Sequence, residues 1–124
     1  MRKVRILVSS SPALSQVIEH LFRGRSEFEI VGRVNGLRTL RRESARLIPQ
    51  LIVADVKPIG TRVSRAAASI KDFSPSSKLI LICSVREFMG RARDCGADAC
   101  LEQEKLVESL VPAARALSTG KTTS

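Results

Sequence analysis

Short apolar runs alternate along the chain with longer segments in which apolar residues recur every three or four positions. The short runs, bounded by Gly, Pro, Ser or Asn, are typical of buried strands, whereas the longer spacing is typical of amphipathic helices. The pattern predicts strands at 4–8, 29–34, 51–55 and 78–83, and a weaker fifth strand at 97–101. It predicts helices from Pro12 to Gly24, from Leu37 to near Pro49, from Val63 to before Pro75, from Phe88 to Gly96, and from Leu106 to Leu117.

The regular alternation of strand and helix decides the expected fold class. Strands joined by helices through short loops form right-handed crossovers, which produce a parallel sheet covered on both faces. We therefore expect an α/β fold with a doubly wound, five-stranded parallel sheet in the order 2-1-3-4-5. In this order the first and third strands are neighbours, and functional sites lie in the crevice outside their carboxyl ends.

One carboxylate stands at that expected crevice. The run 51–54 is entirely apolar and ends in Asp55, so the strand delivers this side chain to the C-terminal edge of the sheet. The first strand instead ends in two hydroxyl residues, Ser9 and Ser10. The strand order brings the three residues together, which makes this edge the candidate functional site.

The length of the chain fits one domain. With 124 residues and 44% hydrophobic content, the chain is long enough to bury a single core. We expect a domain over residues 1–120 and a polar tail over 121–124. No apolar run approaches the ~18 residues that span a membrane, and the N-terminal residues do not form a signal peptide. The protein is therefore predicted to be cytoplasmic, with no membrane partner.

The three cysteines, Cys83, Cys95 and Cys100, are an odd number and lack CxxC spacing. With His20 as the single histidine, they indicate neither a disulfide framework nor a structural zinc site, and we expect reduced thiols. Cys83 and Cys100 are expected on neighbouring strands near the carboxyl ends. There they serve as small core residues, or alternatively in a redox or metal role.

A formal net charge of +9 is the one compositional extreme. Four arginines are expected on the outer side of the second helix: Arg38, Arg41, Arg42 and Arg46. Like charges four residues apart destabilise a helix slightly unless a countercharge is near. A solvated face is the simplest interpretation, and the alternative is an acidic partner or a weak contact with the nucleic-acid backbone. The chain contains no helix-turn-helix, so base-specific DNA recognition is not expected.

Taken together, the order and spacing of several motifs resemble the receiver domains of two-component response regulators over residues 3–120. The resemblance is nearest to receivers of helix-turn-helix transcription regulators. It rests on the stretches 5–12, 28–32, 96–101 and 114–120. It implies the flavodoxin-like (βα)5 receiver fold and places Asp55 at the phosphoacceptor position.

Several positions depart from the pattern that the resemblance implies. The acidic pair that holds Mg²⁺ together with the acceptor falls on Ser9 and Ser10. The hydroxyl position at the end of the fourth strand falls on Cys83, and the aromatic switch position of the fifth strand falls on Cys100. The lysine position falls on Gln103.

Two further departures lie close to these. Lys105 follows the lysine position by two residues, and Pro58 stands three residues after Asp55, one fewer than in the pattern.

These departures bear on phosphoryl transfer, which needs a nucleophilic carboxylate, a divalent ion and a fixed cation. Removing one such electrostatic group commonly lowers the rate of transfer by about 10² to 10³. Asp55 with serine hydroxyls is expected to bind Mg²⁺ at millimolar concentrations or worse, so we expect no cofactor beyond weak Mg²⁺. An ion pair of Asp55 with Lys57 or Lys105 is an alternative arrangement of the site.

We therefore expect an atypical receiver, or pseudo-receiver. It is no enzyme, and it acts as a regulatory protein-interaction module in signal transduction, without efficient phosphorylation of Asp55. One alternative is a phosphorylatable regulator in a phosphorelay, and another is a basic nucleic-acid-binding module. The resemblance implies a signalling or output partner on the face of helix 4, strand 5 and helix 5, near Arg86, Arg91 and Arg93. A homodimer through this face is a further alternative.

Overall fold

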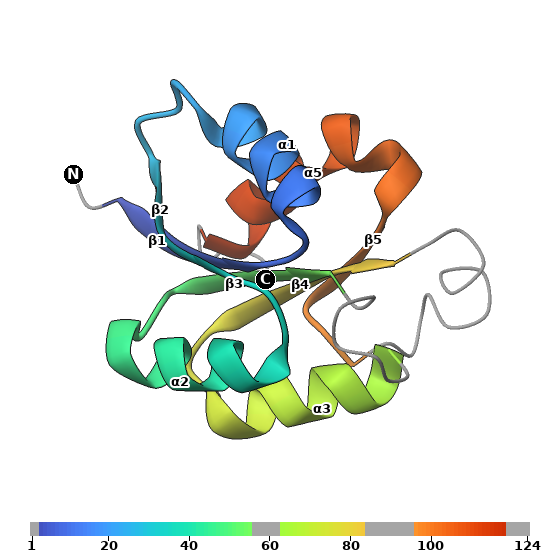
Figure 1. Ribbon diagram of the computed structural model, residues 1–124. Helices are drawn as coiled ribbons and strands as arrows, with labels where there is room; N and C mark the ends of the chain where they lie inside the picture. The colour runs from blue at the N-terminus through green and yellow to red at the C-terminus, as the bar shows by residue number, and fades with distance from the viewer. Residues whose placement is uncertain (1–2, 56–62, 84–95, 119–124) are drawn as a thin grey trace.

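The computed structural model describes residues 3–55, 63–83 and 96–118. Within these residues the chain forms a five-stranded parallel sheet in the order β2-β1-β3-β4-β5, with helices on both faces (Figure 1). The predicted fold class and strand order are confirmed. The elements are β1 (Val4–Ser9), α1 (Pro12–Phe22), β2 (Phe28–Val34), α2 (Leu37–Leu47), β3 (Leu51–Asp55), α3 (Val63–Phe73), β4 (Lys78–Cys83), β5 (Ala99–Glu102), the 3-10 helix η3 (Gln103–Lys105) and α5 (Leu106–Ser118).

The central strands are buried on both faces, and their alternate residues divide the core into two layers. Leu51 and Val53 of β3 pack in the layer of α1 and α5, whereas Ile52 and Ala54 pack in the layer of α2 and α3. Figure 1 shows α1 and α5 above the sheet and α2 and α3 below it. Because successive side chains of a strand point to opposite faces, a strand covered on both sides needs a continuous apolar run. Asp55 is then the single polar residue of β3, at its carboxyl end.

Helix α1 begins where Ser11 and Pro12 predict a helix start. The Ser11 Oγ accepts a hydrogen bond from the Leu14 N–H over 3.4 Å, and Pro12 occupies the first turn, where a missing N–H costs nothing. At the other end of the helix, the ring of Phe22 meets that of Phe28 edge-on, with centroids 4.9 Å apart. The cap and the ring pair hold the helix in a fixed place over β1 and β2.

The last strand begins later than predicted, at Ala99 rather than residue 97, and it extends to Glu102. Asp98 explains the difference. Its N–H donates to the Leu79 carbonyl oxygen over 2.9 Å, and its Oδ2 accepts from the Leu79 N–H and from the Lys71 Nζ, each over 2.7 Å. These bonds shape a turn before the strand, so the ladder with β4 starts at Ala99, opposite Ile80, two residues later than predicted.

Two predicted segments lie outside the described residues: the helix that begins at Phe88 and the tail at 121–124. Among the helices that the structure describes, none is long and apolar enough to cross a membrane.

Candidate functional site at the carboxyl edge of the sheet

Asp55 and the two serines that follow β1 lie at neighbouring strand ends. Asp55 ends β3 and is 6% exposed, while Ser9 pairs in register with Ala54 and is fully buried, and Ser10 is 2% exposed. The structure thus brings together the three residues that the strand order placed at one crevice. Lys57 and Pro58, which follow Asp55 in the sequence, lie outside the described residues.

The Ser9 hydroxyl is used to hold the turn between β2 and α2. Its Oγ accepts a hydrogen bond from the Gly36 N–H over 3.4 Å. Gly36 is the N-cap of α2 and has a φ of 117°, a conformation that favours glycine. Ser9 therefore satisfies one of the backbone donors at the start of a helix whose N-cap has no side chain of its own.

The Ser10 hydroxyl is used to hold the first turn of α1. Its Oγ lies 2.6 Å from the Ser15 Oγ and donates to the Ser11 carbonyl oxygen over 3.0 Å. The Ser10 N–H donates to the Val34 carbonyl oxygen over 3.0 Å, which continues the contact between β1 and β2. Ser10 therefore links the end of β1 to the helix that follows it.

These oxygen donors fit Mg²⁺ poorly. The ion prefers near-octahedral oxygen coordination that usually includes one or two carboxylates. After β1 the structure offers two neutral hydroxyls in place of carboxylates, and each already makes a hydrogen bond to a neighbouring turn. Nor do the described residues contain a group of three or more His, Cys, Asp or Glu that could hold a metal ion.

The position where the resemblance expects a lysine carries an exposed, neutral side chain. Gln103 begins η3 directly after β5. Lys105, two residues further on, has its Nζ 3.6 Å from the Glu102 Oε2. The ion pair that the structure gives Lys105 is therefore with Glu102, in place of the pairing with Asp55 considered from the sequence.

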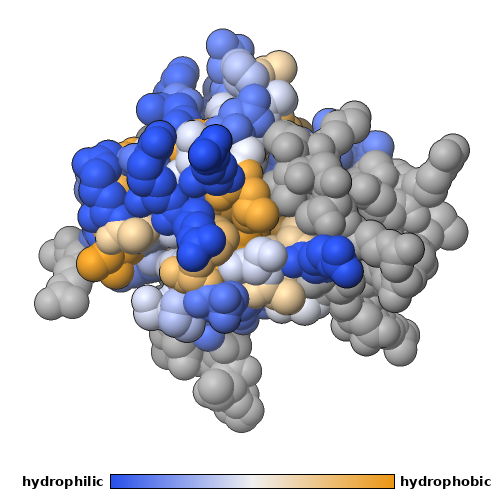
Figure 2. Space-filling view, turned by 60° about the horizontal axis from the view of Figure 1, so that its bottom comes forward, coloured by the Kyte–Doolittle hydropathy of each residue, from blue (hydrophilic) through white to orange (hydrophobic). Residues whose placement is uncertain are grey.

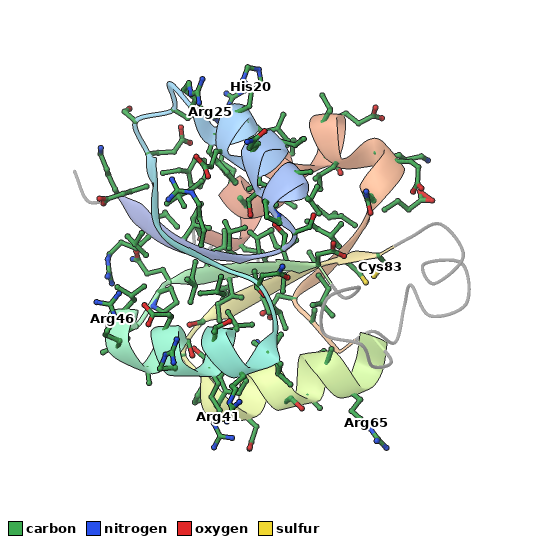
Figure 3. The ribbon with its side chains drawn as sticks, viewed as in Figure 1. His20, Arg25, Arg41, Arg46, Arg65 and Cys83 are labelled. Atoms are coloured by element: carbon green, nitrogen blue, oxygen red, sulfur yellow. The ribbon has the colours of Figure 1, made fainter. Side chains whose placement is uncertain are left out.

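Cys83 and Cys100 lie on adjacent strands, as the strand order predicted. The sheet register sets Cys83 opposite Glu102 and Cys100 opposite Leu81, so the two cysteines are one repeat of the pleat apart. Both pack in the layer of α2 and α3, and their Sγ atoms are 3.2 Å apart. In Figure 3, Cys83 lies at the carboxyl end of β4.

The four arginines of α2 are all exposed, as predicted for the outer side of this helix: Arg38, Arg41, Arg42 and Arg46. Figure 2, which brings the face of α2 and α3 forward, shows hydrophilic side chains gathered there, and Figure 3 shows Arg41 pointing away from the sheet.

Glu43 supplies the countercharge that this helix needs. The Arg46 Nη2 lies 2.6 Å from its Oε1, and the Arg42 Nε lies 3.8 Å from its Oε2. The hydrogen bond from Arg46 holds the pKa of the Glu43 carboxyl below its usual value and raises the pKa of Arg46. Arg38 and Arg41 make no ion pair with a described residue, so the positive charge of α2 is only partly balanced.

Sequence reasoning missed the residues that engage the two serines and the residue that sets the start of β5. Ser15 carried a usable signal, because it follows the N-cap Ser11 by four positions and neighbours Leu14 on the buried stripe of α1. Gly36 carried no comparable signal, because it engages Ser9 through its backbone N–H. Arg86, Arg91 and Arg93, predicted near a partner face, lie outside the described residues, as does Cys95.

Comparison with solved structures finds proteins of the same fold. The receiver domain of the response regulator NarL from Mycobacterium tuberculosis matches with a TM-score of 0.78 at 16% identity, covering 98% of this chain and 100% of that one. A LuxR-family two-component response regulator from Aurantimonas sp. SI85-9A1 matches with a TM-score of 0.79 at 20% identity, covering 95% and 86% of the two chains. The isolated receiver domain of RcsB from Salmonella enterica serovar Typhimurium matches with a TM-score of 0.81 at 16% identity, covering 96% and 90%.

No protein-family model matches the sequence, and no curated protein sequence matches it either. At 16 to 20% identity the structural likeness establishes the fold, while the chemistry rests on this chain's own residues. The chain has the flavodoxin-like receiver fold, and it is similar over nearly its whole length to the receiver domains of these response regulators.

Proposed function

We propose that this chain is a receiver-like regulatory module that works in cytoplasmic signal transduction through contacts with another protein, without efficient phosphorylation of Asp55. The observation that carries this proposal is the use of the Ser9 and Ser10 hydroxyls. The Ser9 hydroxyl accepts from the Gly36 N–H, and the Ser10 hydroxyl is hydrogen-bonded to the Ser15 hydroxyl. Both groups are neutral, so neither supplies negative charge beside Asp55.

The chemistry of aspartyl phosphorylation explains why this observation matters. A phosphoryl donor brings negative charge to a carboxylate that is itself negative, and transfer needs cations that neutralise both. Carboxylate ligands that would hold a divalent ion are replaced by hydroxyls, and the lysine position carries the neutral Gln103. Each missing electrostatic group of this kind lowers the rate by about 10² to 10³.

The regulatory part of the proposal concerns the face formed by β5 and α5. Val107, near the start of α5, is 72% exposed, so an apolar side chain on this face is available for contact with a protein surface. LuxR-family regulators, to which the fold is similar, include a DNA-binding response regulator from Staphylococcus aureus, matched at 17% identity. A signalling or output domain is the proposed partner, and a second copy of this chain is the alternative.

Phosphorylation of Asp55 is tested directly by mass. The protein is incubated with a small phosphodonor such as acetyl phosphate and with Mg²⁺, and its intact mass is followed over time. We expect no stoichiometric phosphoryl adduct on the wild-type chain or on Asp55→Asn. A full adduct on the wild type that disappears in Asp55→Asn would overturn the proposal in favour of a phosphorelay regulator.

A second candidate function, weak binding of the nucleic-acid backbone, is favoured by the net charge of +9 and by the exposed Arg38 and Arg41, which make no ion pair with a described residue. Phosphate contacts of this kind weaken steeply with salt. The test is retention of duplex DNA at low salt, compared with a variant that carries Arg38→Glu, Arg41→Glu and Arg42→Glu.

The matched control for that test reverses three exposed charges elsewhere, with Lys3→Glu, Arg23→Glu and Arg25→Glu. Retention that is lost in the α2 variant and kept in the control supports the candidate. Equal loss in both variants, or no retention by the wild type, excludes a specific role for α2.

A further inference from the structure

The two cysteines of β4 and β5 are close enough to react with each other. Their Sγ atoms lie 3.2 Å apart, a separation at which the two sulfurs are not bonded to each other. A disulfide needs the sulfurs ~2.05 Å apart, which is about 1 Å closer than they lie here. Because the two cysteines are diagonal neighbours in the register, about 7–8 Å apart along the backbone, closing the bond also draws the ends of β4 and β5 slightly together. Cys83 and Cys100 also share one face of the sheet, packed in the layer of α2 and α3.

The two thiols differ in how readily a reagent reaches them. Cys83 is 1% exposed, whereas Cys100 is only partly buried. A small oxidant therefore meets Cys100 first, and Cys83 stands within reach of whatever forms there. The pair thus has the arrangement of a partly exposed thiol that reacts first, beside a buried thiol that can resolve the product.

We propose that Cys83 and Cys100 form a reversible redox site that a small hydroperoxide oxidises to an intramolecular disulfide. In the first step the Cys100 thiolate attacks the peroxide, the O–O bond breaks, a sulfenic acid forms, and the departing hydroxide takes a proton to leave as water. In the second step the Cys83 sulfur attacks the Cys100 sulfur, the S–O bond breaks, and the hydroxyl leaves as water with the Cys83 proton. Two thiols and one hydrogen peroxide become one disulfide and two waters, and a dithiol reductant reverses the change.

The disulfide would tie the end of β4 to β5 across the edge of the sheet. The resemblance to receivers places switch positions at these two residues, so the redox state of the pair is suited to control the partner face of β5 and α5. This use of the site rests on the proposed function, whereas the thiol chemistry itself does not.

The site is tested on the full wild-type chain with hydrogen peroxide as the probe. Trypsin cuts after Lys78, Arg86, Arg93 and Lys105, which leaves Cys83 in the peptide 79–86 and Cys100 in the peptide 94–105. The second peptide also contains Cys95, and a protease that cuts before Asp98 separates Cys95 from Cys100. We expect a cross-linked Cys83–Cys100 peptide under non-reducing conditions, a fall from three free thiols to one, and full recovery with dithiothreitol.

Single variants test the order of the two steps. In Cys83→Ser the sulfenic acid has no resolving thiol, so a dione probe for sulfenic acids should label Cys100. In Cys100→Ser the buried Cys83 should remain unlabelled. Cys95→Ser serves as the control and should form the cross-link as the wild type does.

Peroxide treatment that leaves three free thiols, or a cross-link that runs through Cys95, would overturn the proposal. Equal dione labelling of Cys100 in Cys83→Ser and of Cys83 in Cys100→Ser would overturn the proposal that the peroxide reacts first with Cys100. These results do not depend on phosphorylation or on a partner, so failure of the redox site and failure of the proposed function are separate outcomes.

Discussion

The resemblance to receivers implies carboxylates at the positions of Ser9 and Ser10, where the structure has hydroxyls that each hold a neighbouring turn. The consequence is local. Compared with a pair of carboxylates at these positions, the two serines give the C-terminal edge of the sheet less negative charge, and their hydroxyls make hydrogen bonds within the fold. Asp55 keeps its place because an apolar strand delivers it there, independently of the residues around it. At the scale of residues, the place of Asp55 and the residues beside it are thus set by separate parts of the sequence.

Ile48 adopts a backbone conformation that suits glycine. It is the C-cap of α2 with a φ of 46°, and its side chain is 65% exposed. A left-handed conformation costs a residue with a Cβ about 1 to 2 kcal/mol. We expect Ile48→Gly to raise the free energy of unfolding by about 1 kcal/mol, as measured by urea denaturation.

Ile48→Ala is the control for that variant, because it removes the exposed side chain but keeps a Cβ. Its gain in unfolding free energy should be clearly smaller. An equal gain in both variants would assign the effect to the exposed apolar side chain and contradict the backbone explanation.

Asp98 connects three elements through one carboxylate. Its Oδ2 accepts from the Lys71 Nζ of α3 and from the Leu79 N–H of β4, and its side chain is 22% exposed. Hydrogen bonds to charged groups contribute about 1.5 to 3 kcal/mol. We expect Asp98→Ala to lower the free energy of unfolding by about 2 kcal/mol, and Asp98→Asn, which keeps an acceptor, to lower it less.

The comparison variant is Asp72→Ala, which removes an exposed carboxylate from α3. Its effect on the urea midpoint should be small. A loss in Asp98→Ala no larger than in Asp72→Ala would mean that the three-way contact does not stabilise the fold.

At the scale of elements, the approach of α2 to the sheet depends on Gly32. The ladder between β1 and β2 shifts register between Ile6 and Leu7, and Gly32 then lies opposite Leu7. A Cβ on Gly32 would lie 3.0 Å from the Cδ1 atoms of Leu7 and Leu47. The absence of a side chain thus lets α2 pack closely on this edge of the sheet. The alternation at 29–34 predicted a regular strand and contained no signal of this irregularity.

An ion pair between Arg115 and Glu27 joins α5 to the turn before β2. The Arg115 Nε lies 2.7 Å from the Glu27 Oε2, and this hydrogen bond holds the pKa of the Glu27 carboxyl below its usual value of 4.5. A lowered folded pKa stabilises the protein above the unfolded pKa, and the contribution is lost as pH falls through the folded pKa. We expect Arg115→Gln to lower the urea midpoint at about pH 7, and the difference from wild type to shrink as pH falls below the usual Glu27 pKa of 4.5.

The control for this prediction is Glu29→Gln, which changes an exposed carboxylate of β2 that makes no ion pair with a described residue. The difference between Arg115→Gln and the wild type should also shrink at high salt, because both partners of the pair are solvent-exposed. A difference that persists unchanged at acid pH would show that Arg115 stabilises the fold by packing alone.

At the scale of the whole molecule, the binding of a divalent ion would appear as added stability. A ligand at concentration L that binds only the folded chain raises its stability by RT ln(1 + L/Kd), which is close to zero when the ligand concentration is below the Kd. We expect millimolar Mg²⁺ to leave the melting temperature of the wild type nearly unchanged. The double variant Ser9→Asp, Ser10→Asp should gain a Mg²⁺-dependent rise several-fold larger, because it adds two carboxylates beside Asp55.

Adding Asp55→Asn to the double variant should reduce that rise, and matched ionic strength in NaCl separates binding from screening of the net charge of +9. A rise in the wild type equal to that of the double variant would contradict the poor fit of the serine pair to Mg²⁺.

The sequence alone determined the α/β class, the strand order and the place of Asp55, because hydrophobic periodicity and the handedness of crossovers act through local pattern and chain connectivity. Only the tertiary structure decided that Ser9 meets Gly36 and that Asp98 sets the start of β5. It alone also brought Cys83 within 3.2 Å of Cys100, and Arg115 against Glu27, which is 88 residues away in the chain. Periodicity tells which face of an element a residue occupies, whereas these contacts depend on register and packing between elements at the scale of single ångströms.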